Sequence, residues 1–159
     1  MKINLILYSE RIILFILESD TTTMNRIING INLVGWSAVL FTVAFRLVSN
    51  PVGFEQSDIT TEVYLLKAVQ SFMIVDILLI LIGASKGSIL GSLAQITGRL
   101  IVALYYLTPE TSPQAFALMA IIWAIADVNR YLYYTIKNPI TTFLRYNSFM
   151  ILYPIGIIG

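Results

Sequence analysis

The sequence predicts an all-α fold, a polytopic transmembrane helix bundle with about five helices. Of its 159 residues, 57% are hydrophobic and only 12% are charged, about half the charged fraction of a typical soluble domain. The mean hydropathy is +0.80. A small chain with so little charge cannot cover its surface in water, so lipid is the solvent that fits this composition.

Five apolar segments approach the length of roughly 20 residues that a helix needs to cross a bilayer. The links between them are rich in Pro, Gly, Ser and Asn, which end helices. Because most links are short, consecutive helices are expected to run antiparallel. The predicted spans are 31–48, 63–84, 89–107, 115–136 and 141–158.

The chain divides into a bundle at 24–159 and an N-terminal extension at 1–23. The extension is apolar, but Ser9, Glu10 and Arg11 interrupt it. Charges inside the apolar stretch make it a poor signal peptide. Two interpretations stay open: an interfacial helix, and a lineage-specific addition in front of Met24.

The residue types that are missing limit the chemistry. The chain contains no Cys and no His, which excludes disulfides, thiolate metal sites and the commonest general base near neutral pH. Any catalysis must use Asp, Glu, Tyr, Lys, Arg or Ser, and we expect neither a metal nor a cofactor. A net charge of +1 without a basic run also makes nucleic acid an unexpected partner.

Charges in the links predict an orientation. Cationic links alternate with acidic ones along the chain, and positive charge favours the cytoplasmic side. The N-terminus is therefore expected in the cytoplasm. Tyrosines fall near both predicted interfaces, at Tyr105 and Tyr106 on one side and at Tyr131, Tyr133 and Tyr134 on the other. The region before the first span carries Lys2, Arg11 and Arg26, and the first link carries Glu55, Asp58 and Glu62. The next three links carry Lys86, Glu110 and Lys137 in turn.

Ionisable side chains inside the spans are the strongest functional indication, because each needs a partner or a water-filled site. At 1.5 Å rise per residue, all five lie about 6 to 15 Å from the cytoplasmic helix ends. They come from four spans but occupy one layer, which we expect to form the floor of a cytoplasm-facing polar pocket. These residues are Asp76, Arg99, Asp127, Arg130 and Arg145.

The spacing alone leaves the role of each charge open. Asp127 and Arg130 stand at i and i+3 and share one helix face, either as a helix-locking ion pair or as part of a reactive site. Arg99 either locks the bundle or binds an anionic group of a ligand. Arg145 is shallow enough to extend to the interface.

Tyr153 is followed by Pro154 and Gly156 in the last predicted span. Pro removes a backbone hydrogen bond and kinks the helix, and such a break is tolerated in a membrane where it lines a cavity. The freed carbonyl and the absent glycine side chain leave room beside the Tyr153 hydroxyl. A packing role, with the hydroxyl bonded to a carbonyl, is the alternative.

Several motifs resemble one known family. The segment 144–156, LRYNSFMILYPIG, resembles a signature of R-Y, then F, then L-Y-P-x-G, and 123–134, WAIADVNRYLYY, resembles W-S-x-x-E-x-x-R-Y-x-x-Y. Residues 76–83 and 95–99 resemble L-E-x-x-H with a following G, and Q-x-x-S-R. These are motifs of the very-long-chain (3R)-3-hydroxyacyl-CoA dehydratases, also called protein tyrosine phosphatase-like proteins. The similarity runs from about residue 29 to residue 159.

The resemblance implies a lyase of fatty-acid elongation in the endoplasmic reticulum membrane. It would dehydrate (3R)-3-hydroxyacyl-CoA to trans-2-enoyl-CoA without a cofactor, beside other elongation enzymes and membrane lipid. Tyr153 would be catalytic, with a Glu seven residues later as its partner. The supporting residues implied are Arg99, which with Arg130 orients the pocket or stabilises negative charge, Asp127, which holds Arg130, and also Gly156 and Asp76.

This sequence departs from the family pattern at several points. Asp76 and Asp127 replace Glu, Leu79 replaces His, and Gly98 replaces Ser. The expected Glu and the family's sixth helix would follow Gly159, so we expect a C-terminally truncated chain. The alternative function is a catalytically inactive relative that serves as a membrane scaffold or interaction partner.

Overall fold

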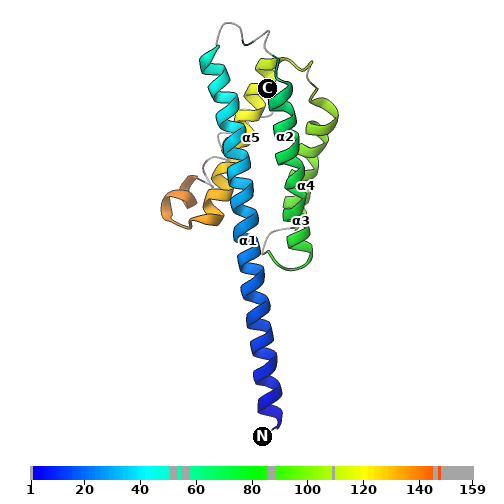
Figure 1. The fold of residues 1–159 in the computed structure, drawn as a ribbon, viewed down its shortest axis with the longest axis vertical. Coiled ribbons are helices and arrows are strands. Elements are labelled where there is room, and N and C mark those ends of the chain that lie inside the picture. Colours follow the sequence, from blue (N-terminus) through cyan, green and yellow to red (C-terminus); the bar gives the residue numbers. More distant parts are fainter. Residues whose placement is uncertain are drawn as a thin grey trace.

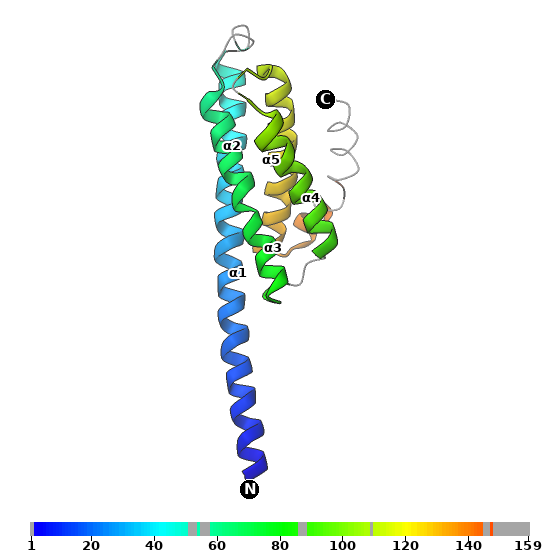
Figure 2. The same cartoon turned by 90° about the vertical axis from the view of Figure 1, so that its right-hand side faces the viewer.

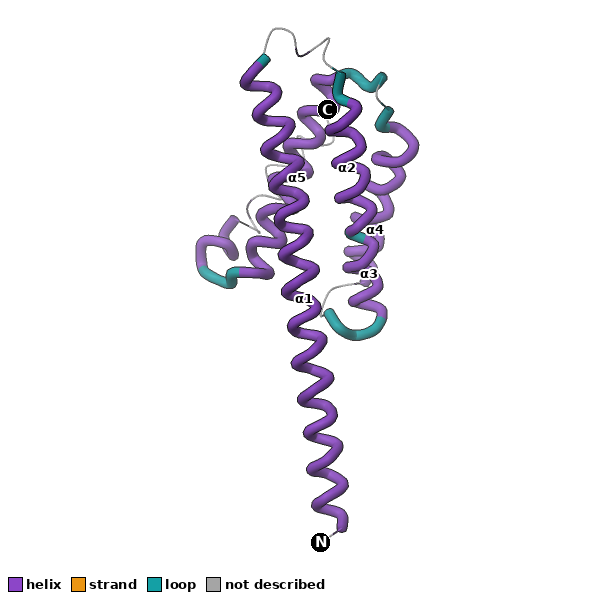
Figure 3. The backbone as a smooth tube through the Cα atoms, in the orientation of Figure 1, coloured by secondary structure: helices purple, strands orange, loops and turns teal. Residues whose placement is uncertain are grey.

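The computed structural model describes residues 2–50, 54, 58–85, 89–108, 110–144 and 147. In this part of the chain every regular element is helical, as the tube in Figure 3 shows. The order along the chain is α1 (Lys2–Ser49), α2 (Thr60–Phe72), α3 (Ile74–Leu81), α4 (Ile89–Ile101), the π-helix η2 (Val102–Tyr106) and α5 (Pro113–Thr135).

The helix α1 is much longer than predicted. It runs without interruption through Met24, and its N-terminal half extends beyond the other helices (Figure 1). Its C-terminal half packs along α5 and α2. The division into an extension at 1–23 and a bundle at 24–159 stays a prediction, although no helix break marks that boundary.

The second predicted span is one rod made of two helices. A single turn at Met73 joins α2 to α3, with the Met73 amide donating to the Gln70 carbonyl at 3.3 Å. The rod ends near Gly83, whose φ of +74° lies in the left-handed region that glycine adopts most easily at a helix end. The helix α3, which carries Asp76, lies at the end of the bundle from which the long α1 projects (Figure 1).

The third predicted span, 89–107, contains α4 and η2 in succession. Figure 2 shows this rod alongside the α2–α3 rod, against which it packs. The wider turns of η2 end at Leu107, where the backbone becomes extended. Pro113 then begins α5, in the first-turn position where its missing N–H has no cost.

Three helices in the described residues are long and apolar enough to cross a membrane: Thr21–Ser49, Thr60–Leu81 and Pro113–Thr135. The predicted span 89–107 is not among them; it contains 13 residues of α4 followed by five of η2. The fifth predicted span lies mostly outside the described residues, with only 141–144 and 147 helical. The all-α membrane bundle is confirmed.

Apolar side chains fill one half of the bundle, away from the end at which the long α1 projects. Small residues on α5 allow the close helix approach that drives packing in membranes. The same helices expose large apolar side chains outward, such as Val34 and Phe41 of α1, as expected for surfaces that face lipid. The buried residues of this apolar half are Val39, Val43, Val63, Leu66, Phe116, Ala117 and Ala120.

Candidate functional site

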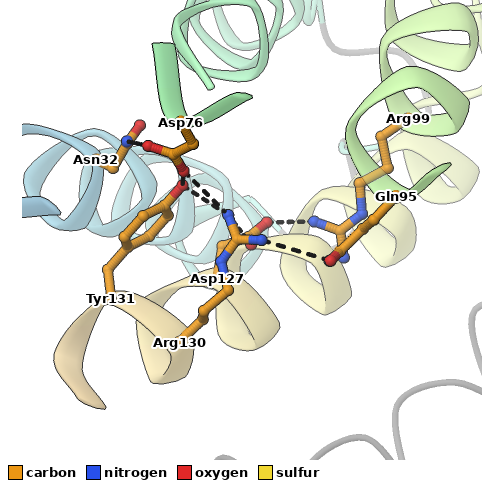
Figure 4. Close-up of polar contacts among 7 residues, drawn as sticks. All are labelled: Asn32, Asp76, Gln95, Arg99, Asp127, Arg130 and Tyr131. Carbon is orange, nitrogen blue, oxygen red and sulfur yellow. Dashed lines mark hydrogen bonds and ion pairs between the residues drawn. The ribbon is translucent and has the colours of Figure 1, made fainter. Parts of the chain in front are cut away.

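Four of the five ionisable side chains predicted inside the spans meet in the bundle. Asp76 comes from α3, Arg99 from α4, and Asp127 and Arg130 from α5 (Figure 4). The fifth, Arg145, lies outside the described residues. The prediction of one shared layer is therefore confirmed for these four side chains. We call them, together with their partners Asn32, Gln95 and Tyr131, the polar network.

Asp127 is the centre of the charged contacts and is only 1% exposed. Its Oδ2 accepts a hydrogen bond from Arg99 Nη1. Its Oδ1 lies 3.3 Å from Arg130 Nη2, an ion pair whose angle does not make a hydrogen bond. One carboxylate therefore joins α4 to α5 and also holds Arg130 on its own helix.

Asp76 is held from two other helices. Tyr131 donates its hydroxyl hydrogen to Asp76 Oδ2, and Asn32 Nδ2 of α1 donates to Oδ1 at 3.2 Å. Arg130 Nη2 lies 3.7 Å from Asp76 Oδ2. The network thus links α1, α3, α4 and α5 through side chains alone.

Arg130 spans the gap between the two carboxylates, as Figure 4 shows. Its Nη2 donates to the Tyr131 hydroxyl at 2.6 Å, and its Nη1 donates to Gln95 Oε1 at 3.4 Å. The guanidinium also lies 4.6 Å from the centre of the Tyr131 ring, and that of Arg99 lies 5.1 Å from the Trp123 ring. Aromatic faces favour a cation at this distance, so each arginine has a carboxylate and a ring as partners.

The charges of the network balance, because two carboxylates face two guanidinium groups. In a hydrocarbon environment this pairing offsets part of the large cost of removing each ion from water. The contacts match the helix-locking interpretation of Asp127 and Arg130 and the bundle-locking interpretation of Arg99. Binding of a substrate anion by Arg99 stays a prediction.

Tyr131 was expected at a membrane interface, and that expectation is wrong. Its side chain is fully buried because its hydroxyl is used between Asp76 and Arg130. Sequence spacing carried this information: Ala120, Ala124, Asp127 and Tyr131 recur at helical intervals and form the buried stripe of α5. Tyr105 and Tyr106 are 78% and 73% exposed, as residues at an interface would be.

The other sequence-predicted site residues have no described position. Tyr153 and Gly156 both lie outside the described residues. Within the described part of the chain, no cluster of three or more carboxylates could hold a metal ion. The polar network is therefore the part of the predicted site that the structure describes.

The chain matches the family model described as "Protein tyrosine phosphatase-like protein, PTPLA" over residues 70–159. This match includes every member of the polar network except Asn32. No solved structure matches the chain significantly.

The curated relatives are named as dehydratases. The chain is 27% identical over 140 residues to the very-long-chain (3R)-3-hydroxyacyl-CoA dehydratase hpo-8 of Caenorhabditis elegans, covering 82% of this chain and 63% of the relative. It is 30% identical over 138 residues to the dehydratase PASTICCINO 2 of Arabidopsis thaliana, covering 81% and 61%. A probable dehydratase of Schizosaccharomyces pombe is 32% identical over 102 residues, covering 58% and 49%.

The chain thus spans about three fifths or less of the length of these relatives. The family model, by contrast, covers more than half of the chain, and the matched region holds the paired charges of α3, α4 and α5. The chain therefore belongs to the protein tyrosine phosphatase-like (PTPLA) family.

Proposed function

We propose that this membrane protein removes water from (3R)-3-hydroxyacyl-CoA and forms trans-2-enoyl-CoA, as a step of very-long-chain fatty-acid elongation. The observation that carries the proposal is the similarity over 82% of the chain to a relative named as such a dehydratase. The absence of Cys and His is compatible with it, because the reaction needs only proton transfers.

The reaction breaks the C2–H and C3–O bonds and forms the C2–C3 double bond. A base takes the C2 proton, the thioester carbonyl spreads the developing negative charge, and an acid protonates the departing hydroxyl, which leaves as water. By resemblance, Tyr153 is one of the two proton-transfer groups and a Glu is the other. Gly156, three residues after Tyr153 in the sequence, would leave space for the reacting carbons.

The polar network supports this site without taking part in bond breaking. Asp76, Asp127, Arg99 and Arg130 pair with one another, and Asn32 joins Asp76 to α1. Their role is to fix α1, α3, α4 and α5 at set distances. Preorganised helices keep reacting groups within the narrow geometry that catalysis requires. By resemblance, Arg99 and Arg130 would also stabilise the negative charge that develops on the thioester oxygen.

The acyl chain would lie between apolar helices, while the CoA group stays at the cytoplasmic side with the N-terminus. Localisation to the endoplasmic reticulum and contact with other elongation enzymes are part of the same proposal. They rest on the relatives and on the charge pattern of the links.

A catalytically inactive scaffold is the alternative, motivated by Asp at positions 76 and 127 in place of Glu. Loss of the ionic contacts would favour that alternative. Both shorter side chains nevertheless reach their partners: Asp127 pairs with Arg99 and Arg130, and Asp76 lies 3.7 Å from Arg130. The retained pairing supports the enzyme.

The test is turnover by the product of the complete reading frame in liposomes. Long-chain (3R)-3-hydroxyacyl-CoA is added, and enoyl-CoA is followed by mass spectrometry. We expect turnover that Tyr153→Phe abolishes and that Tyr105→Phe, at an exposed position, leaves unchanged. No turnover, or equal turnover in Tyr153→Phe, would overturn the proposal.

A further inference from the structure

Two further polar side chains are buried close to the polar network but not joined to it. Gln70 of α2 and Trp36 of α1 are both 0% exposed. Among the described residues, neither amide atom of Gln70 has a hydrogen-bond partner, and neither does Trp36 Nε1. Two donors, Gln70 Nε2 and Trp36 Nε1, and one acceptor, Gln70 Oε1, are therefore enclosed in the bundle without a described protein partner.

The two side chains lie at one level of the bundle. A Cβ added at Gly35 would lie 3.2 Å from both methyl carbons of Val69, so α1 and α2 touch at the residues that immediately precede Trp36 and Gln70. Trp36 lies one helical turn, about 6 Å, from Asn32 of the network. Gln70 lies six residues before Asp76, about 9 Å at helical rise.

Gln70 faces the interior because it belongs to the buried stripe of α2. Val63, Leu66 and Gln70 are buried at i, i+3 and i+7, and Met73 continues the stripe. Apolar residues occupy the other three positions. Glu62, the other buried polar residue of α2, pairs with Arg46 at 3.0 Å. Gln70 is therefore the one polar side chain of this row in which no polar atom has a described partner.

An unpaired buried amide or indole N–H costs about 1–3 kcal/mol, and the bilayer supplies no water to offset that cost. Leu or Met at position 70 would fill the same space without it. Buried polar atoms that lack partners require an explanation, such as a bound water, an ion or a functional role. The positions of these atoms, beside a charged network in the proposed enzyme, fit a ligand.

We propose that Gln70 and Trp36 bind the reacting end of the 3-hydroxyacyl thioester; this inference rests on the proposed function. The thioester carbonyl accepts from Trp36 Nε1 and Gln70 Nε2, while the 3-hydroxyl donates to Gln70 Oε1. These donors and this acceptor match a substrate that carries an oxygen at C1 and a hydroxyl at C3. Gln70 thereby selects acyl chains that carry the 3-hydroxyl, because a ligand without it leaves Oε1 unpaired.

The test compares two ligands that differ only in the 3-hydroxyl: (3R)-3-hydroxyacyl-CoA and the saturated acyl-CoA of equal length. Binding is measured with the full chain in lipid nanodiscs, in a Tyr153→Phe background that preserves the substrate. We expect the hydroxylated ligand to bind about tenfold more tightly, as one good hydrogen bond allows. Gln70→Leu should bring that ratio close to one. It should also weaken binding of the saturated acyl-CoA, because both ligands lose the hydrogen bond from Gln70 Nε2 to the thioester carbonyl.

Leu66→Met, one turn away on the same stripe, is the matched control and should keep the tenfold ratio. A second readout does not depend on substitution at position 70. The indole N–H resonance of Trp36, assigned with Trp123→Phe because the chain has two tryptophans, should shift when the hydroxylated ligand binds.

The outcomes separate this inference from the proposed function. If both ligands bind but Gln70→Leu leaves their ratio unchanged, or the Trp36 resonance does not move, Gln70 and Trp36 hold water or pack only, and the inference fails alone. If neither ligand binds to the parent protein, the proposed function and the inference fail together.

Discussion

The two halves of the bundle are built by the same helices but differ in the polar side chains that they bury. In the apolar half, α1, α2 and α5 contribute residues such as Val39, Leu66 and Ala120. In the other half, the same helices contribute Asn32, Gln70 and Asp127 to buried positions. In a membrane, close packing of small apolar residues is enough to hold helices together. Charged side chains are therefore not needed merely to pack helices in a membrane, and those of the polar half indicate a functional site.

Removing the cation that lies between the two aspartates should have the largest effect on the stability of the polar half. Arg130→Met leaves Asp76 and Asp127 buried with one guanidinium fewer, and loss of one partner of a buried pair costs about 3–5 kcal/mol. We expect a loss of that size in the free energy of unfolding, measured by denaturant titration in mixed micelles. Arg26→Met, at an exposed position of α1, is the control and should stay within about 0.5 kcal/mol. Equal effects would show that the network is not buried as described.

A smaller loss is expected when only the hydroxyl between Asp76 and Arg130 is removed. Tyr131→Phe keeps the ring under the Arg130 guanidinium but deletes one donor and one acceptor, which costs about 1–3 kcal/mol. Thermal unfolding of the purified protein should register the change. Tyr64→Phe, on the 62% exposed tyrosine of α2, should have no measurable effect. A Tyr131→Phe variant as stable as the parent would mean that the hydroxyl does not stabilise the network.

Much of this site could be predicted from spacing and depth. The i, i+3 relation of Asp127 and Arg130, with helical rise from the predicted span ends, placed Asp76 and Arg99 in the same layer, and these four side chains meet. The composition also predicted the membrane bundle. These features follow from the period of the helix and from the cost of placing charge in lipid. Both can be evaluated from the positions of residues along a single sequence.

Other features depend on contacts between helices and could not be predicted from single helices. Tyr131 resembles an interfacial tyrosine until its partners Asp76 and Arg130 are known. The turn at Met73 and the π-helix Val102–Tyr106 have no distinctive residue pattern, and both were predicted as continuous spans. Gln70 could have been found from the stripe of α2, but its lack of partners only appears in three dimensions.

The contact between α1 and α2 can be tested with glycine. A methyl group at Gly35 would meet the Val69 side chain at 3.2 Å, whereas one at Gly30 meets nothing within 4 Å. Alanine has a higher helix propensity than glycine at both positions. Only at Gly35 does overpacking against Val69 oppose that gain. We expect Gly35→Ala to be less stable than Gly30→Ala by about 1 kcal/mol. Val69→Ala should remove the difference; a difference that persists in Val69→Ala would contradict the contact.

The smallest effect concerns Asp58, an exposed residue in the link before α2. The Thr60 hydroxyl and backbone amide hold the pKa of Asp58 below its ordinary value, with the amide at 2.9 Å from Oδ1. A lowered carboxylate pKa stabilises the fold above the unfolded pKa of about 3.9, and that contribution is lost as pH falls through the folded pKa. A ¹³C NMR titration should give a midpoint below 3.9, and Thr60→Val should raise it. An unchanged midpoint in Thr60→Val would show that the hydroxyl does not act on Asp58.

The coupling between Arg99 and Asp127 tests the central claim most directly, because it joins two helices inside the bundle. A double-mutant cycle with Arg99→Met and Asp127→Leu leaves Arg130 paired with Asp76, so the double variant stays balanced in charge. We predict that each single variant loses several kcal/mol and that the double variant recovers about 2 kcal/mol or more of the summed loss. Purely additive losses would show that the two side chains do not pair, and would contradict the buried network on which the proposed site is built.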